Sequence, residues 1–288
     1  MKARVFAVLS AVALVVLAAI PASADSEGHS YLALGDSVPF GFNPLVDPTD
    51  SSNFVGYPEA VAQRLDIKDV NATCPGEATG GFLSLTGIDN SCRPYRAAFP
   101  LHVEYQGTQM DFALRYLTGH RDTRLVTVTL GANDFFRWQK DCAKGATFGT
   151  CPLGFFGVLG VIQANLHTIF GKIRATGYTG LIVAVTYYAT DYRDPVGVFT
   201  TQAGEAVTTA AGSTFGVRIA SGFNAWAPVA ATKGGDSCAA GLLIVKPDGT
   251  CDVHPSPLGR DLLAGAVISA VAGSCPAHEA LACLDLNR

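Results

Sequence analysis

The sequence predicts an α/β domain in which helices cover both faces of a parallel sheet of about five strands. Short apolar runs rich in β-branched residues alternate along the chain with stretches of helical periodicity. The strand-like runs are nearly continuous in apolar character, which is typical of parallel strands that are buried on both faces. Ligands of such sheets bind outside the carboxyl ends of the strands, so functional residues are expected there.

Five runs are strand candidates, and turn residues bound the clearest of them. They are residues 30–34 (SYLAL), 67–72 (IKDVNA), 124–130 (RLVTVTL), 181–188 (LIVAVTYY) and 215–220 (FGVRIA). The third and fourth have the strongest pattern, and the third ends at Gly131.

Amphipathic stretches separate these runs. In the clearest one, apolar residues recur at helical spacing from Val158 to Ile173, and Gly177 follows as a stop signal. The other predicted helices are residues 57–65, with Pro58 near the start, residues 107–117 and residues 256–271.

The N-terminus has the pattern of a secretory signal peptide. Lys2 and Arg4 precede an apolar run over residues 5–20, and the small residues Ala22 and Ala24 flank Ser23 at a cleavage pattern. An uncleaved anchor is the alternative, but this run is short for a membrane span. We therefore predict a signal peptide over residues 1–24, a single domain over residues 25–288, and secretion.

Composition limits the partners. The net charge is −4 and only 15% of the residues are charged, so no polyanion-binding surface is indicated and nucleic acid is not an expected partner. No second apolar span stands out, so we predict no stable membrane span. We expect a monomer.

Eight cysteines follow the predicted signal peptide, and an even number in an exported chain indicates disulfides. Pairing in sequence order is the simplest arrangement, although about 105 pairings are possible. No spacing fits a C-x-x-C motif, so zinc and redox sites are disfavoured and we predict no metal. The four pairs in order are Cys74–Cys92, Cys142–Cys151, Cys238–Cys251 and Cys275–Cys283.

Four polar or glycine positions follow predicted strands or precede the last helix. Ser37 ends the first strand in GDSV, Gly76 follows the second in CPGE, Asn133 follows the third in GAND, and His254 precedes the last helix in DVHP. A serine hydroxyl becomes a nucleophile when an imidazole takes its proton. The resulting oxyanion needs preorganised donors, which backbone N–H groups and an Asn amide can supply.

These four blocks, in this order, resemble the SGNH (GDSL-type) hydrolase family over nearly the whole mature chain. The resemblance implies a flavodoxin-like three-layer α/β/α fold and no cofactor. It also implies that Ser37 is the nucleophile and His254 the general base. The N–H groups of Ser37 and Gly76 and the side chain of Asn133 would form the oxyanion hole, while Asp36 would order the turn.

One position departs from the family pattern, in which an aspartate stands three residues before the histidine. Cys251 occupies that position here, and Asp252 stands two residues before His254. Residues i and i−2 share a side in an extended chain, so Asp252 is the favoured third catalytic residue. The alternative is a backbone carbonyl near Thr250 or Cys251, which would leave a Ser–His dyad.

The resemblance implies a secreted serine esterase or lipase acting on a small-molecule or lipid ester. A phospholipase and a glycan O-acetylesterase are variants on the same fold, and a non-catalytic exported binding protein is a third possibility. An α/β-hydrolase is disfavoured because GDSVP lacks the second glycine of G-x-S-x-G. Aromatic residues near the site either pack the loops or form an acyl groove: Phe40, Phe42, Phe54, Phe135, Phe136 and Trp138.

Overall fold

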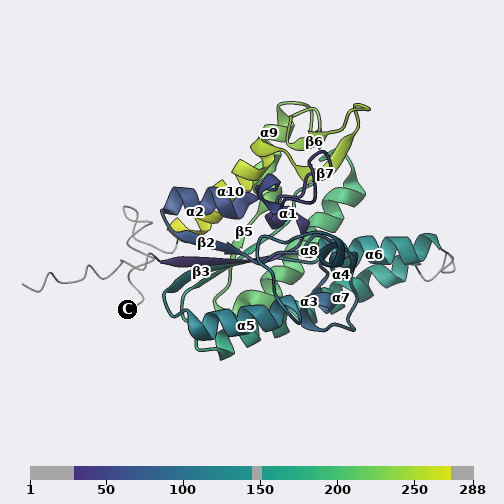
Figure 1. The fold of residues 1–288 in the computed structure, drawn as a ribbon. Coiled ribbons are helices and arrows are strands. Elements are labelled where there is room, and N and C mark those ends of the chain that lie inside the picture. Colours follow the sequence, from purple (N-terminus) through teal and green to yellow (C-terminus); the bar gives the residue numbers. More distant parts are fainter. Residues whose placement is uncertain (1–28, 145–150, 274–288) are drawn as a thin grey trace, which may run out of the picture.

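A parallel five-stranded sheet of order β2-β1-β3-β4-β5 forms the centre of the molecule (Figure 1). The computed structural model describes residues 29–144 and 151–273, and only the backbone of residues 151–153. The strands are β1 Ser30–Gly35, β2 Lys68–Asn71, β3 Thr123–Thr129, β4 Leu181–Val185 and β5 Arg218–Ala220. All five predicted strands are confirmed. Their order is that of flavodoxin-like domains, in which the switch point lies between β1 and β3.

Helices cover both faces of this sheet and complete three layers (Figure 1). Side chains alternate along each strand, so Tyr31 and Ala33 enter one core cluster while Leu32 and Leu34 enter the other. The first cluster is covered by α2 Tyr57–Leu65, α9 Gly222–Ala231 and α10 Pro257–Ala272. The second is covered by α5 Gln109–Gly119, α7 Cys151–Ala175 and α8 Pro195–Gly212. The predicted α/β/α architecture is confirmed.

Helix α7 is the longest helix of the described residues, and its stretch Gly154–Ala175 is apolar enough to cross a membrane by length and composition. The predicted apolar stripe is buried in the second cluster through Ile162, Leu166, Ile169 and Ile173. The helix packs against α8 on one side and α6 Ala132–Ala143 on another. A long apolar helix of a domain core passes the same test, so α7 is weak evidence for a span.

Several elements were not predicted. Short helices lie in the loops at the sheet edge: α1 Ser37–Phe40, α3 Thr79–Leu83 and α4 Cys92–Ala98. The run after β3 continues directly into α6, and a two-stranded antiparallel sheet joins β6 Leu243–Val245 to β7 Cys251–Pro255. Helix α8 was missed because it is rich in Gly and Thr, which are poor helix formers.

Two of the four disulfides expected from pairing in order are present, Cys74–Cys92 and Cys238–Cys251. Cys142 is also disulfide-bonded, but the side chain of its expected partner Cys151 lies outside the described residues. The predicted signal peptide and the pair Cys275–Cys283 also lie outside them.

Candidate active site

The turn after β1 places Ser37 at the carboxyl edge of the sheet. Gly35 has φ +142°, and a Cβ atom there would lie 2.3 Å from the carbonyl oxygen of Thr129, so only glycine fits this close approach of β1 and β3. Asp36 caps α1, because its Oδ1 accepts the N–H of Val38 at 3.0 Å. Ser37 is thereby the first residue of a short helix at the switch point.

Strand β7 brings His254 to Ser37. The distance from His254 Nε2 to Ser37 Oγ is 2.8 Å, and the other ring nitrogen, Nδ1, contacts Asp252 Oδ1. Asp252 Oδ1 also accepts the backbone N–H of His254 at 3.1 Å. The two residues lie on one side of extended chain, as expected from their spacing. The hydrogen bond from His254 holds the pKa of Asp252 below its usual range, so this carboxylate is ionised at neutral pH.

Three contacts fix the position of β7. The disulfide Cys238–Cys251 ties its first residue to the loop between α9 and β6. The hydroxyl of Tyr188, just past β4, donates to the carbonyl of Val253 at 2.8 Å. The ring of Phe42 packs against the imidazole of His254 with centroids 4.9 Å apart. The histidine is therefore held from three separate parts of the chain.

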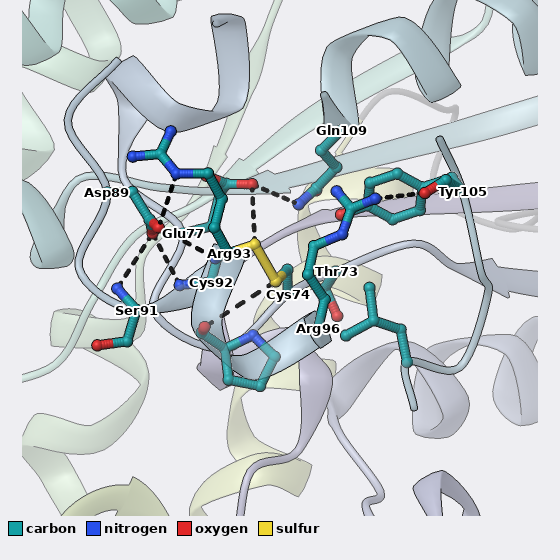
Figure 2. The surroundings of a disulfide bond; sticks show 12 residues. Thr73, Cys74, Glu77, Asp89, Ser91, Cys92, Arg93, Arg96, Tyr105 and Gln109 are labelled. Carbon is teal, nitrogen blue, oxygen red and sulfur yellow. Dashed lines mark hydrogen bonds and ion pairs between the residues drawn. A yellow bond between two sulfur atoms is a disulfide. The ribbon is translucent and has the colours of Figure 1, made fainter. Parts of the chain in front are cut away.

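A second loop carries Gly76 to the same edge of the sheet. Gly76 has φ +85°, and a Cβ atom there would lie 2.6 Å from the carbonyl oxygen of Asn90. Asn90 in turn donates its N–H to Gly76 O at 3.0 Å. The disulfide Cys74–Cys92 closes this loop (Figure 2). The two sides of the loop are therefore joined by a disulfide and by a backbone hydrogen bond.

Asn133 lies in the first turn of α6 and joins the two loops. Its Nδ2 donates to Glu77 O at 3.0 Å and to Asp36 Oδ2 at 3.3 Å. Its Oδ1 accepts from Asn90 Nδ2 at 2.8 Å. The structure thus brings Ser37, Gly76, Asn133 and His254 together at one edge, although they come from four distant blocks of sequence.

Two buried carboxyl groups lie behind these residues. Burial raises the pKa of Asp36 to about 6, despite hydrogen bonds from Tyr187 and Val38. Burial also raises the pKa of Glu77 to about 8. The carboxyl group of Glu77 lies beside the disulfide and the amide of Gln109 (Figure 2). Of these groups, only Asp36 was predicted, as the residue that orders the turn, and its bond to Val38 confirms that role.

A cavity of about 330 Å³ opens beside Ser37 and His254 and extends between β4, α6, α7 and α8. Of the predicted groove aromatics, Phe135 and Phe136 line it. Phe40 and Phe54 are buried in the core instead. No sequence pattern indicated the opposite wall of the cavity. Helix α8 supplies it through Val196, Gly197, Thr200, Thr201, Gly204 and Thr208.

The molecule is thus a flavodoxin-like α/β/α domain with a Ser–His–Asp group at its switch point. Comparison with protein-family models gives the family: residues 33–262 match the GDSL-like lipase/acylhydrolase family. The chain belongs to this family, and it is accordingly a carboxylic ester hydrolase by family. A search of curated proteins finds no significant match.

Three of the solved structures with a similar fold are hydrolases. A phospholipase A1 from Streptomyces albidoflavus is 16% identical to this chain, with a TM-score of 0.57. The superposition covers 84% of this chain and 99% of the phospholipase chain. An extracellular lipase from Streptomyces rimosus is 17% identical, with a TM-score of 0.56, and the superposition covers 84% of this chain and 100% of the lipase chain. An acetylxylan esterase from Geobacillus stearothermophilus, solved as a catalytic mutant, is 18% identical with a TM-score of 0.54. The superposition covers 85% of this chain and 94% of the esterase chain. At these identities the likeness establishes the fold.

Proposed function

We propose that the protein is a secreted serine esterase or lipase that hydrolyses carboxylic esters through an acyl-enzyme on Ser37. The observation that carries the proposal is the continuous contact from Ser37 Oγ through both ring nitrogens of His254 to Asp252. His254 takes the serine proton as Oγ attacks the ester carbonyl, and then gives it to the leaving alcohol. A water molecule, activated by the same imidazole, releases the acid.

Asp252 is the third residue of this group. Its ionised carboxylate accepts a hydrogen bond from Nδ1–H, which leaves Nε2 unprotonated and able to take the proton of Ser37. The same contact stabilises the imidazolium that forms during attack. The contact with Asp252 supports a triad over a dyad oriented by a backbone carbonyl.

The oxyanion hole is formed by Ser37, Gly76 and Asn133. Within the described part of the chain, no hydrogen bond occupies the backbone N–H of Ser37 or of Gly76. Asn133 has two amide hydrogens, and the one directed at Asp36 makes the longer bond at 3.3 Å. This hydrogen is the one available to a developing oxyanion, because the other is held at 3.0 Å by Glu77 O.

The acyl part of the substrate enters the cavity beside Ser37. Apolar side chains line its inner part, including Val128, Leu130, Ile162 and Leu166. Such a lining favours an aliphatic acyl chain over acetyl, since each buried methylene contributes about 0.8 kcal/mol. A phospholipase is the second candidate, because it would place a fatty acyl chain in the same cavity, and a phospholipase A1 shares the fold.

Secretion is supported by the signal-peptide pattern of residues 1–24, the disulfides, and the extracellular lipase among the similar structures. We infer that residues 25–288 form the mature, single-domain enzyme.

Hydrolysis of p-nitrophenyl esters of graded acyl length tests the activity, with phosphatidylcholine and acetylated xylan as parallel substrates. We expect turnover of aliphatic esters longer than acetate and its loss in Ser37→Ala. Folded wild-type protein that cleaves none of these esters would indicate a non-catalytic binding protein. Preference for acetylated xylan would instead indicate a glycan O-acetylesterase.

A further inference from the structure

The amide of Asn133 can take only one of its two orientations. Both acceptors near Nδ2, Glu77 O and Asp36 Oδ2, are oxygen atoms that would repel Oδ1 if the amide turned over. On the other side, Asn90 Nδ2 is a donor that requires Oδ1. The orientation of the proposed oxyanion donor is therefore fixed from two sides.

The orientation of Asn90 is fixed in the same way. Lys140 on α6 donates from Nζ to Asn90 Oδ1 at 2.8 Å, and an ammonium group can only donate. The amide group of Asn90 must therefore turn its Nδ2 toward Asn133. Hydrogen bonds run in one direction from Lys140 through Asn90 and Asn133 to the carbonyl of Glu77.

The backbone at Asn90 is also held in place. Its N–H bonds to Gly76 O at 3.0 Å, and the disulfide Cys74–Cys92 joins the two sides of the loop at the neighbouring positions. The carboxyl group of Asp89 accepts hydrogen bonds from the N–H groups of Ser91 and Cys92 (Figure 2). The N···O distances are 3.1 and 2.7 Å. Asn90 therefore has a fixed position from which to act on Asn133.

We propose that Asn90 is a positioning residue for ester hydrolysis, because its Nδ2–H orients the Asn133 amide so that Nδ2 faces the Ser37 turn. The inference rests on the proposed function, in which Asn133 donates to the oxyanion. Asn90 acts through Asn133 and does not itself touch the substrate.

Replacement by aspartate separates this role from a structural one. Asn90→Asp keeps the size of the side chain and gains an ion pair with Lys140, but it replaces the donor to Asn133 by an oxygen. Two oxygens then face each other, and because Glu77 O and Asp36 Oδ2 disfavour a turned amide, the repulsion displaces the whole Asn133 side chain and moves Nδ2 away from the oxyanion. Asn90→Ala removes both hydrogen bonds but repels nothing, because it leaves Asn133 Oδ1 to solvent.

The test measures kcat, KM and thermal stability of Asn90→Asp, Asn90→Ala and Lys140→Met with the best p-nitrophenyl ester. Losing one oxyanion donor costs about 100- to 1,000-fold in kcat, so we expect a roughly 30- to 100-fold lower kcat in Asn90→Asp and a roughly 3- to 10-fold lower kcat in Asn90→Ala. KM stays within about twofold in both variants, because the oxyanion forms only after binding. Lys140→Met retains kcat within about threefold, since water can donate at this exposed position.

The rank order of kcat in Asn90→Asp and Asn90→Ala distinguishes a positioning role from a structural one. A structural role predicts that Asn90→Ala, which loses more bonds, is at least as impaired and less stable, and this result would overturn the proposal. A long-range effect of the new charge would fade between about 0.1 M and about 1 M salt, as the Debye length falls from about 10 to about 3 Å. A deficit that disappears in high salt would also overturn it.

Asn133→Ala separates failure of this inference from failure of the proposed function. If Asn133→Ala is impaired while Asn90→Asp is not, the positioning role of Asn90 is wrong and the oxyanion hole stands. If Asn133→Ala is as active as wild type, the oxyanion role of Asn133 is wrong, and the inference fails with it.

Discussion

The two walls of the active site are built in different ways. On the oxyanion side, Asn133 is joined by side-chain hydrogen bonds to Asp36, Glu77 and Asn90, which lie on separate segments. On the acyl side, two threonines of α8 that line the cavity bond within their own helix, Thr201 to Gly197 O at 2.9 Å and Thr208 to Gly204 O at 2.8 Å. The first wall is thus cross-linked through its functional side chain to three other segments. These threonines of the second wall bond only within α8, which is itself joined to Thr186 and Ser221 through Glu205.

This difference separates rate from selectivity. Changes on the cross-linked wall alter groups that every ester meets in its transition state, so they should slow all substrates alike. Changes on α8 alter the space for the acyl chain, so they should change which ester is preferred.

Asp252→Asn should lower kcat by up to about 10⁴-fold for all esters, because the amide favours the wrong tautomer of His254. Steady-state hydrolysis measures the loss. Asp248→Asn, at an exposed position in the same β6–β7 hairpin, is the matched control and should stay near wild type. A loss of only a few-fold in Asp252→Asn would favour a dyad oriented by a backbone carbonyl.

Asn133→Ala should lower kcat by about 100- to 1,000-fold, the range expected for one oxyanion-hole donor. The loss should be equal for short and long acyl chains, since the donor faces the carbonyl group and not the chain. A loss that grew with acyl length would place Asn133 in the acyl pocket and break the separation.

Gly204→Leu should shorten the preferred acyl chain. Gly204 lines the cavity, and a Cβ atom there would meet nothing within 4 Å, so the leucine side chain can extend into the cavity without a clash. At about 0.8 kcal/mol per methylene, two displaced methylenes lower kcat/KM for long esters by about tenfold or more, while acetate and butyrate esters change little.

Gly160→Leu is the matched control for this change. Gly160 is exposed on α7, and a Cβ atom there also meets nothing within 4 Å, but the residue does not line the cavity. Its chain-length profile should match wild type. An unchanged profile in Gly204→Leu would show that the acyl chain binds elsewhere.

Glu77→Gln should stabilise the protein increasingly as the pH rises. Burial raises the pKa of Glu77 from 4.5 to about 8, so the folded state holds a proton that the unfolded state releases. The contribution of Glu77 to the free energy of unfolding of the wild type is therefore complete below about pH 4.5 and is lost by about pH 8. Between these values the free energy of unfolding falls by up to about 1.4 kcal/mol per pH unit. Thermal melts of both proteins should therefore diverge over this range. Parallel melts at every pH would contradict the buried, protonated state of Glu77.

The strands and the residues at their ends could be predicted from the sequence, because both are local signals. Buried parallel strands require apolar β-branched runs, and Ser37 and Asn133 directly follow such runs. Asp252 could be predicted from its spacing to His254, because strand geometry places alternate residues on one side.

The groups that surround these residues could not be predicted, for physical reasons. Asn90 reaches Asn133 only because a disulfide and Gly76 fold its loop back, which is a tertiary effect with no local pattern. Tyr187 lies in an apolar run that predicts a strand, yet β4 ends two residues earlier, at Val185. The hydroxyl group of Tyr187 donates to Asp36 instead. The residues of α8 have weak helix propensity, and the helix is stabilised by its packing against α7. No local pattern therefore predicts this helix or the acyl wall that it forms.

Labelling with a fluorophosphonate identifies the nucleophile directly, because this reagent forms a stable adduct with an activated serine. Intact-mass and peptide mass spectrometry should find one adduct per wild-type chain, on Ser37. Ser37→Ala should not be labelled, and His254→Gln should be labelled far more slowly, because no imidazole takes the proton. An adduct on another serine, or equal labelling of wild type and His254→Gln, would contradict the assignment of Ser37 and His254 as nucleophile and base.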